Sequence, residues 1–167
     1  MQIPGERIRI FFEMEGKYRE KDAEYFRRLL TSSDFVVRAR ATCILAEIGG
    51  REYIPDLARV LLEDDNPIVR HEAAYSLGQL GYREAIPYLV QSMKTDPHPI
   101  VRHESAIALG VIGKEEPVPE LIQALEDPSQ EVVDSAIIAL SNIEFCKRLF
   151  SASTDETSLE FARKTGG

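Results

Sequence analysis

The sequence has 167 residues, which is enough for one compact domain or a short array of repeats. Its net charge of -8 argues against a nucleic-acid partner, because binding to phosphates needs a basic surface. We find no signal peptide and no apolar run of membrane-spanning length. Cys43 and Cys146 are far apart and form no CxxC motif, so a reducing, cytoplasmic location is expected.

Residues 1–33 are expected to cap a repeat array that follows them. One or two helices are predicted within residues 6–30. The apolar side chains that would face the first repeat are Tyr25, Phe26, Leu29 and Leu30.

From residue 34 onward the sequence repeats itself with a period of 31 or 32 residues. Each period holds an apolar column, then a glycine suited to a left-handed helix end, then a proline suited to a first helical turn. These columns are Val37, Val69, Val101 and Val132; Leu45, Leu77, Leu109 and Leu140; Gly49, Gly81 and Gly113; and Pro55, Pro87 and Pro119. Each unit is therefore predicted to be helix, glycine turn, helix and short polar turn.

Helix pairs of this kind stack because one pair cannot bury its apolar stripe alone. The predicted fold is all-α, a short α-solenoid with full units at about 34–64, 65–96 and 97–127. A half unit at 128–145, whose helix would end near Phe145, closes the array. Residues 146–167 are assigned to a C-terminal tail that is expected to be flexible, because its last part is rich in Ser, Thr and charge.

Two consecutive repeats carry a His-Glu pair at the same position, His71-Glu72 and His103-Glu104. A turn of 100° per residue places each histidine opposite the core stripe and each glutamate on its flank. Neighbouring helices lie roughly 10 Å apart, so two imidazoles and two carboxylates share one face and can lean toward a common point. Imidazole and carboxylate ligands converging from neighbouring elements are what a metal site requires.

Apolar residues flank these pairs on a face that points away from the core. Ile68 and Ile100 lie beside the glutamates, and Tyr75 and Ile107 beside the histidines, which suggests a pocket or an interface. Both pairs lie near the start of their helices, where the positive helix end favours neutral imidazole and ionised carboxylate, the forms that bind metal. The alternative is a solvated His-Glu pair that duplication carried from one repeat into the next.

The stretches from His71 to Leu80, from Ala85 to Pro87 and from Val101 to Gly113 resemble the deoxyhypusine hydroxylase family. That family consists of HEAT-repeat enzymes that bind two irons through His-Glu motifs, and the similarity extends over about residues 34–145. The resemblance implies that His71, Glu72, His103 and Glu104 are iron ligands. It also implies dioxygen activation, hydroxylation of a C–H bond and a basic protein as a possible substrate.

The family enzyme has two such halves with the irons between them, whereas this chain has one. A two-fold homodimer through the His-Glu face would restore the full set of ligands, with two irons per dimer. Two other functions fit the sequence. One is a HEAT-repeat scaffold that binds partner proteins, since short arrays also resemble modules associated with phycobiliprotein lyases. The other is metal binding for storage or sensing.

Arginines recur one residue before the His-Glu register, at Arg38, Arg70 and Arg102. Aspartates lie near them in the turns between repeats. We therefore predict that these arginines form a ladder of salt bridges between repeats and do not bind substrate.

Overall fold

The computed structural model describes residues 5–152, with side chains up to Leu149, and within that range every regular element is helical. The helices are α1 (Gly5–Arg19), α2 (Ala23–Leu29), α3 (Phe35–Ile48), α4 (Ile54–Glu63), α5 (Pro67–Leu80), α6 (Ile86–Thr95), α7 (Pro99–Ile112), α8 (Val118–Ala124) and α9 (Gln130–Ala152). Short 3-10 turns, Arg51–Tyr53 and Arg83–Ala85, precede α4 and α6. None of the described helices is long and apolar enough to cross a membrane.

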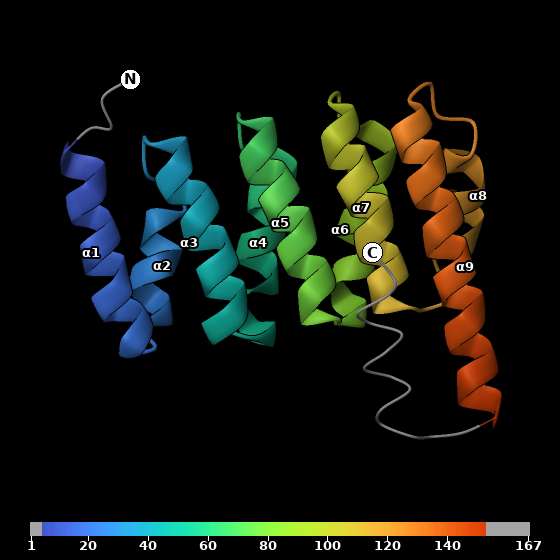
Figure 1. Ribbon diagram of the computed structural model, residues 1–167, viewed down its shortest axis with the longest axis horizontal. Coiled ribbons are helices and arrows are strands. Elements are labelled where there is room, and N and C mark those ends of the chain that lie inside the picture. The colour runs from blue at the N-terminus through green and yellow to red at the C-terminus, as the bar shows by residue number, and fades with distance from the viewer. Residues whose placement is uncertain (1–4, 153–167) are drawn as a thin grey trace.

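The helices form two layers, as an α-solenoid does (Figure 1). The odd-numbered helices α1 to α9 lie side by side in a front layer, and the even-numbered helices α2 to α8 lie behind them. The predicted all-α solenoid is confirmed. Because each front helix contacts the front helix of the next repeat, side chains about 32 residues apart become neighbours across the layer.

Polar side chains and prolines start the helices where the repeat pattern places them. Asp34 and Asn66 accept hydrogen bonds from the backbone N–H groups two residues later, at 2.9 Å each, and so cap α3 and α5. Pro67 and Pro99 occupy the first positions of α5 and α7, where the missing N–H is harmless.

The glycine turns follow the prediction in two repeats and depart from it in one. Gly81 and Gly113 end α5 and α7 in the left-handed region, with φ of 70° and 67°. Gly49 has a φ of -82°, so the left-handed prediction for it was wrong. The first repeat has two adjacent glycines, and it is Gly50 that takes the positive φ, 117°, which reverses the chain.

The core follows the apolar columns of the repeat. The valine column is fully buried throughout, and so are the leucines at the next column in α3, α5 and α7. Leu140 of α9 is only half-buried, since no further described repeat covers that helix. The back layer supplies the opposite wall through Leu57, Leu61, Leu89, Met93 and Leu121.

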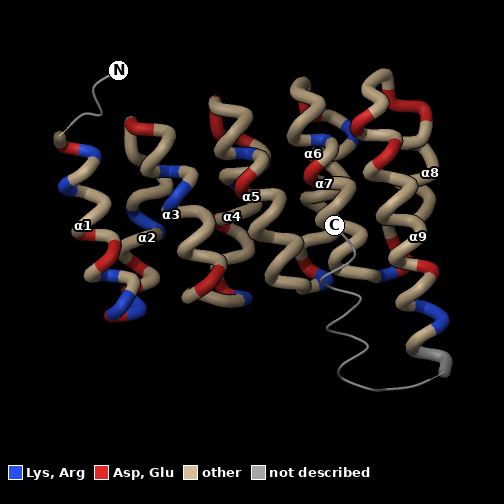
Figure 2. The backbone as a smooth tube through the Cα atoms, viewed as in Figure 1, with Lys and Arg blue, Asp and Glu red and all other residues tan. Residues whose placement is uncertain are grey.

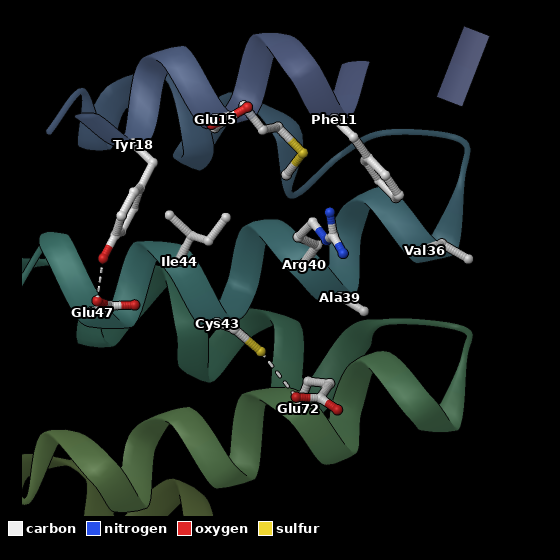
Figure 3. A pocket seen from close by; sticks show the side chains of 11 residues that line it. Phe11, Glu15, Tyr18, Val36, Ala39, Arg40, Cys43, Ile44, Glu47 and Glu72 are labelled. Carbon is white, nitrogen blue, oxygen red and sulfur yellow. Dashed lines mark hydrogen bonds between the residues drawn. The ribbon is translucent and has the colours of Figure 1, made fainter. Parts of the chain in front are cut away.

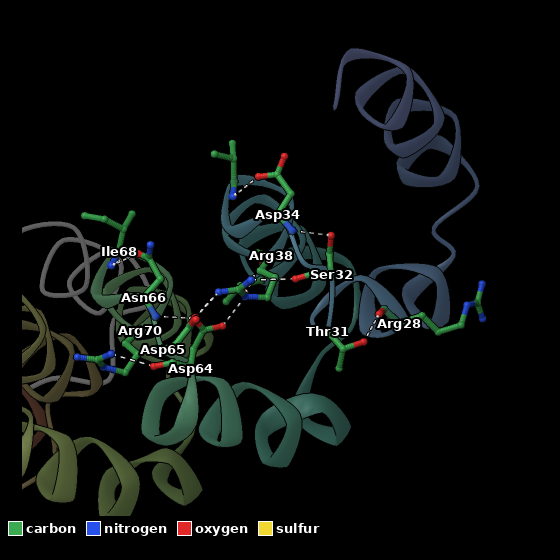
Figure 4. A network of polar contacts seen from close by, with 12 residues as sticks. Arg28, Thr31, Ser32, Asp34, Arg38, Asp64, Asp65, Asn66, Ile68 and Arg70 are labelled. Atoms are coloured by element: carbon green, nitrogen blue, oxygen red, sulfur yellow. Dashed lines mark hydrogen bonds and ion pairs between the residues drawn. The ribbon is translucent and has the colours of Figure 1, made fainter. Parts of the chain in front are cut away.

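The arginine ladder is confirmed, and it clasps the turns between repeats (Figure 4). Arg70 binds both carboxylate oxygens of Asp96 at 2.6 and 2.9 Å. It also donates to the backbone carbonyl of Asp64 at 2.8 Å, a contact that Figure 4 shows. Arg38 and Arg102 make the same contacts one repeat earlier and later, with Asp64 and Asp127. Each arginine therefore joins the turn before its helix to the turn after the next helix.

Arg7 of α1 adds a further rung, because it binds Asp34 at 2.5 and 3.0 Å. It lies 31 residues before Arg38, which is one repeat period. The pair α1–α2 thus occupies the position of a repeat unit as well as capping the array, with Tyr25, Phe26 and Leu30 buried against its neighbours. Figure 2 shows acidic and basic residues together near the upper ends of the front helices.

The last helix is longer than predicted. α9 continues past Phe145 to Ala152, so the boundary placed at residue 145 is too early. Cys146 explains part of the extension, because it is buried and packs closely against Gly113 at the end of α7. Residues 153–167, assigned to the flexible tail, lie outside the described residues.

Candidate functional site

The His-Glu pairs lie in the second turns of α5 and α7, on the front layer. His71 Nε2 of α5 is 3.3 Å from Glu104 Oε2 of α7, and His71 Nδ1 is 3.8 Å from Glu72 Oε1. His71 therefore lies between two carboxylates that come from different repeats. Glu104 is buried, while His71 and Glu72 are partly exposed and accessible from outside.

Close packing of α5 on α7 makes this contact possible. A Cβ atom on Gly78 would lie 2.8 Å from the Cβ of Ala108, so the two helices approach as closely as a glycine allows. As a result, contacts between repeats run diagonally. The residue at the glutamate position of one repeat contacts the histidine of the repeat before. Glu104 contacts His71 in this way, and Ser135 contacts His103.

The His103 ring contacts Ser135 of α9. Its Nδ1 atom is 2.5 Å from Ser135 Oγ, which in turn donates to the backbone carbonyl of Glu131 at 2.7 Å. Within residues 5–149, no group of three His, Cys, Asp or Glu side chains is arranged to hold a metal ion. The expectation that all four ligands lean toward one point in a single chain is therefore wrong, because Ser135 holds one of the two imidazoles.

Cys43 of α3 is a further member of the cluster (Figure 3). Its thiol donates a hydrogen bond to Glu72 Oε2 at 2.9 Å. Burial, together with this carboxylate, raises the pKa of the Cys43 thiol to about 12, so the group stays protonated and remains a donor. The pKa of Glu72 is lowered, chiefly by the hydrogen bond with His71, so Glu72 stays ionised as predicted.

His71 differs from the prediction of a neutral imidazole. Hydrogen bonds first with Glu104 and then with Glu72 raise the pKa of His71 to about 9, against the opposing effect of burial. The helix N-terminus, which would lower the pKa of His71, has less effect than these carboxylates. Its field fades within the first turn, and His71 lies beyond that turn. Without metal, His71 is thus an imidazolium near neutral pH, and a metal ion would have to displace its proton.

The types of donor atom around His71 suit iron, but too few of them converge within the described part of one chain to form a complete site. Imidazole nitrogen and carboxylate oxygen are the ligands of non-haem iron sites, and the carboxylates around His71 favour a positive charge at that point. These residues fit such a group as part of its ligand shell.

An apolar stripe runs across the front layer beside the pairs. Its residues stand four positions after the histidine register in each helix: Phe12, Cys43, Tyr75, Ile107 and Ile138. Tyr75 is 46% exposed and Phe12 is 71% exposed. Ile68 is likewise exposed, whereas Ile100 packs partly against the core. The stripe is therefore continuous from α1 to α9 and open to solvent at its largest members.

The sequence did not point to Phe12, Cys43 and Ser135 on this face, nor to Arg7 as a rung of the ladder. The register of Arg7, one period before Arg38, would have placed Phe12 in the stripe. Cys43 and Ser135 stand in repeats without a His-Glu pair, and only the diagonal contact between repeats brings them to Glu72 and His103.

Comparison with known proteins agrees with this architecture. The sequence profile of HEAT repeats matches residues 24–110 and 89–161. Among solved structures, human deoxyhypusine hydroxylase in complex with glycerol superposes with a TM-score of 0.68 and 28% sequence identity. The match covers 92% of this chain and 62% of that chain, so this chain spans less than two thirds of the human structure. A comparison with curated protein sequences gave no match. The chain therefore belongs to the HEAT-repeat family.

Proposed function

We propose that this protein is a non-haem di-iron, dioxygen-activating protein of the hydroxylase type, and that homodimerisation completes its metal site. The observation that carries the proposal is the position of His71, 3.3 Å from Glu104 and 3.8 Å from Glu72, on a scaffold similar to human deoxyhypusine hydroxylase. Nitrogen and oxygen donors from adjacent repeats thereby gather on one accessible face.

His71, Glu72, His103 and Glu104 would hold the iron, which supplies dioxygen activation for hydroxylation of a C–H bond. The remaining residues orient these ligands. The Cys43 thiol occupies Oε2 of Glu72 and leaves Oε1 directed toward His71. The Ser135 hydroxyl holds Nδ1 of His103, which leaves Nε2 of that ring for a metal.

A second copy of the chain is the natural source of the missing ligands. An isologous interface duplicates whatever lies on it, so a two-fold axis near the pairs would bring two sets of His-Glu ligands together. The exposed apolar stripe beside the pairs, from Phe12 to Ile138, would be buried in that interface. The 62% coverage of the human structure is consistent with a chain that supplies part of such an assembly.

A cytoplasmic location accompanies this proposal. Cys43 and Cys146 form no disulfide in the described part of the chain, and a protonated, hydrogen-bonded Cys43 thiol suits a reducing compartment.

A scaffold that binds another protein without metal is the second candidate. The observation that favours it is the same exposed stripe, because its apolar side chains would serve a foreign partner as well as a second copy. The His-Glu pairs would then be polar members of the interface.

Metal content and oligomeric state, measured on the same sample, test the two candidates. After iron-replete expression we expect a dimer with about one iron per chain. His71→Ala and Glu104→Gln should each lose most of this iron, whereas His98→Ala should keep it. His98 is a suitable control because it is exposed in the turn before α7 and does not occupy the His-Glu position of the repeat.

A strictly monomeric protein without bound metal would contradict the di-iron proposal and favour the protein-binding scaffold. Bound iron that gives no dioxygen-dependent change in visible absorption after reduction would indicate storage in place of catalysis.

A further inference from the structure

A groove between α1 and α3 opens on the same face as the His-Glu pairs and has a volume of about 560 Å³. This volume is within the range of small-molecule sites, roughly 300–1,000 Å³. Its walls are largely apolar, and Figure 3 shows Phe11 and Tyr18 of α1 on one side and Ile44 of α3 on the other. Glu72 of α5 reaches the groove beside Cys43.

Arg40 supplies a positive charge at one end of this groove. Its guanidinium lies over the ring of Phe11, 4.0 Å from the ring centroid. Among the side chains described, up to Leu149, Arg40 forms no ion pair. Stacking on an aromatic ring holds the guanidinium plane while its N–H donors remain available at the edge.

Glu47 supplies a negative charge at the other end. Its carboxylate accepts a hydrogen bond from the hydroxyl of Tyr18 at 2.5 Å, and no cation of the described part of the chain pairs with it. The other acidic residues of the groove are already engaged, Glu15 by Arg19 and Glu72 by His71 and Cys43. The charges still open to a ligand are therefore one positive and one negative.

Arg40 and Glu47 lie two turns apart on one helix. Seven residues at 1.5 Å each separate them by about 10 Å along α3, and Ile44 lies between them on the same side. Met14 of α1 faces this middle section and is buried. The groove thus presents a cation, an apolar floor and an anion in that order.

We propose that this groove binds a small zwitterion with an apolar spacer, its carboxylate held by Arg40 and its ammonium group by Glu47. Guanidinium binds carboxylate in a fork geometry, and Tyr18 holds the Glu47 carboxylate in place for the ammonium group. A diacid would meet the negative charge of Glu47, and a diamine would meet the positive charge of Arg40. Selectivity therefore comes from repulsion as well as attraction.

Binding of the zwitterion requires no metal, but its role as a substrate rests on the proposed function. The spacer would pass beside Glu72, a proposed iron ligand, which places a C–H bond of the spacer near the candidate centre. The basic side chain that the family resemblance implies as substrate lacks the carboxylate, so Arg40 disfavours it.

Calorimetric titration of the metal-free protein with straight-chain ω-amino acids, from aminobutanoate to aminodecanoate, tests this inference. We expect affinity to rise with length and to peak at one intermediate length, which is set by the spacing of Arg40 and Glu47 along α3. Diamines and diacids of the same length should bind at least about tenfold more weakly. Arg40→Gln and Glu47→Gln should each weaken binding of the best amino acid by about tenfold, whereas Arg59→Gln on the back layer should not change it.

The two substitutions should also change selectivity in opposite directions. Arg40→Gln should improve diamines relative to amino acids, and Glu47→Gln should improve diacids. A series without a length optimum, tightest binding by diamines or diacids, or no binding in the millimolar range would overturn the inference. Because the titration uses metal-free protein, a lack of iron leaves this result intact, and a lack of zwitterion binding leaves the iron measurement intact.

Discussion

The Nδ1 atom of His103 lies 2.5 Å from the Oγ atom of Ser135, on the neighbouring front helix. Ser135 has one hydroxyl hydrogen, which it donates to the backbone carbonyl of Glu131. It can therefore only accept from His103, so Nδ1 is the donor in this contact, and in the neutral ring the lone pair lies on Nε2. A ring nitrogen fixed in this way leaves the other nitrogen oriented for a metal.

Replacing Ser135 should release this tautomer. In the metal-free protein we expect the imidazole ¹⁵N shifts to report Nδ1–H for His103, and Ser135→Ala to give a mixture of the two tautomers. Ser135→Thr keeps the hydroxyl and should keep the tautomer. Metal affinity should fall by about 10- to 100-fold in Ser135→Ala, as for other residues that hold metal ligands. A wild-type ring protonated on Nε2 would show that the hydrogen-bond assignment is wrong.

A charge in the apolar stripe should separate the proposed dimer. Tyr75→Glu would place a carboxylate without a partner in a buried interface, so light scattering should report a monomer. The fold should survive, because the Tyr75 side chain is 46% exposed in the single chain. Ile122→Glu is the matched control, since Ile122 is exposed on α8 in the back layer. If both variants remain dimers, the stripe is not the interface.

Loss of one rung of the arginine ladder should cost much of the stability. In Arg70→Met the carboxylate of Asp96, whose side chain is 5% exposed, would remain buried without its partner. We expect the free energy of unfolding in urea to fall by about 3 kcal/mol. Arg59→Met removes a more exposed pair with Asp56, which keeps its contact with Arg27, and should change the free energy of unfolding by less than about 1 kcal/mol. Equal losses in the two variants would mean that burial of the ladder carries no extra energy.

Acid should weaken the same ladder. Arg102 lowers the pKa of Asp127, and Arg7 lowers that of Asp34, so both folded values lie below the unfolded ones. The stability that these carboxylates contribute is complete above their unfolded pKa of about 3.9 and is lost as the pH falls through the folded values. Urea unfolding between about pH 2 and pH 6 should show this loss. In Asp127→Asn, the free energy of unfolding should depend less steeply on pH in this acid range. An equally steep dependence would show that Asp127 does not contribute to the loss.

Close approach of α5 and α7 can be tested at Gly78. Gly78→Ala would place its Cβ atom 2.8 Å from Ala108, so the helices must separate, and we expect a loss of about 1–3 kcal/mol. Gly16→Ala in α1 meets nothing within 4 Å and should leave stability unchanged or raise it by up to about 1 kcal/mol. Ala108→Gly in the Gly78→Ala background should recover part of the loss. Without such recovery, crowding at Ala108 would not be the cause.

The architecture could be predicted from the sequence because a repeat encodes contacts one period apart. The valine column, the glycine turn at Gly81 and the ladder of Arg38, Arg70 and Arg102 all follow from spacing alone. Gly49 and the end of α9 escaped the prediction, since each depends on a neighbour outside the pattern. These neighbours are the second glycine at Gly50 and the packing of Cys146 on α7.

The candidate site was predictable to the level of a shared face, and no further. Periodicity places His71 and His103 in the same register, but hydrogen-bond partners decide how each ring turns. Glu104 attracts one ring and Ser135 the other, although the two histidines are equivalent in the repeat. The protonation of His71 likewise depends on distances to carboxylates, which spacing along the chain does not give.

Within the described helices, the arginine clasps lie at one end of the front layer. At the opposite end, beside the glycine turns, neighbouring repeats are joined by exposed pairs such as Arg51 with Glu84 and Lys147 with Glu115. When the solenoid bends, we therefore expect the helix ends at the arginine ladder to stay together and the ends beside the glycine turns to move apart. His71 directly follows Arg70 in the chain, so the distance between the two His-Glu pairs stays nearly constant while the far ends of the helices move apart.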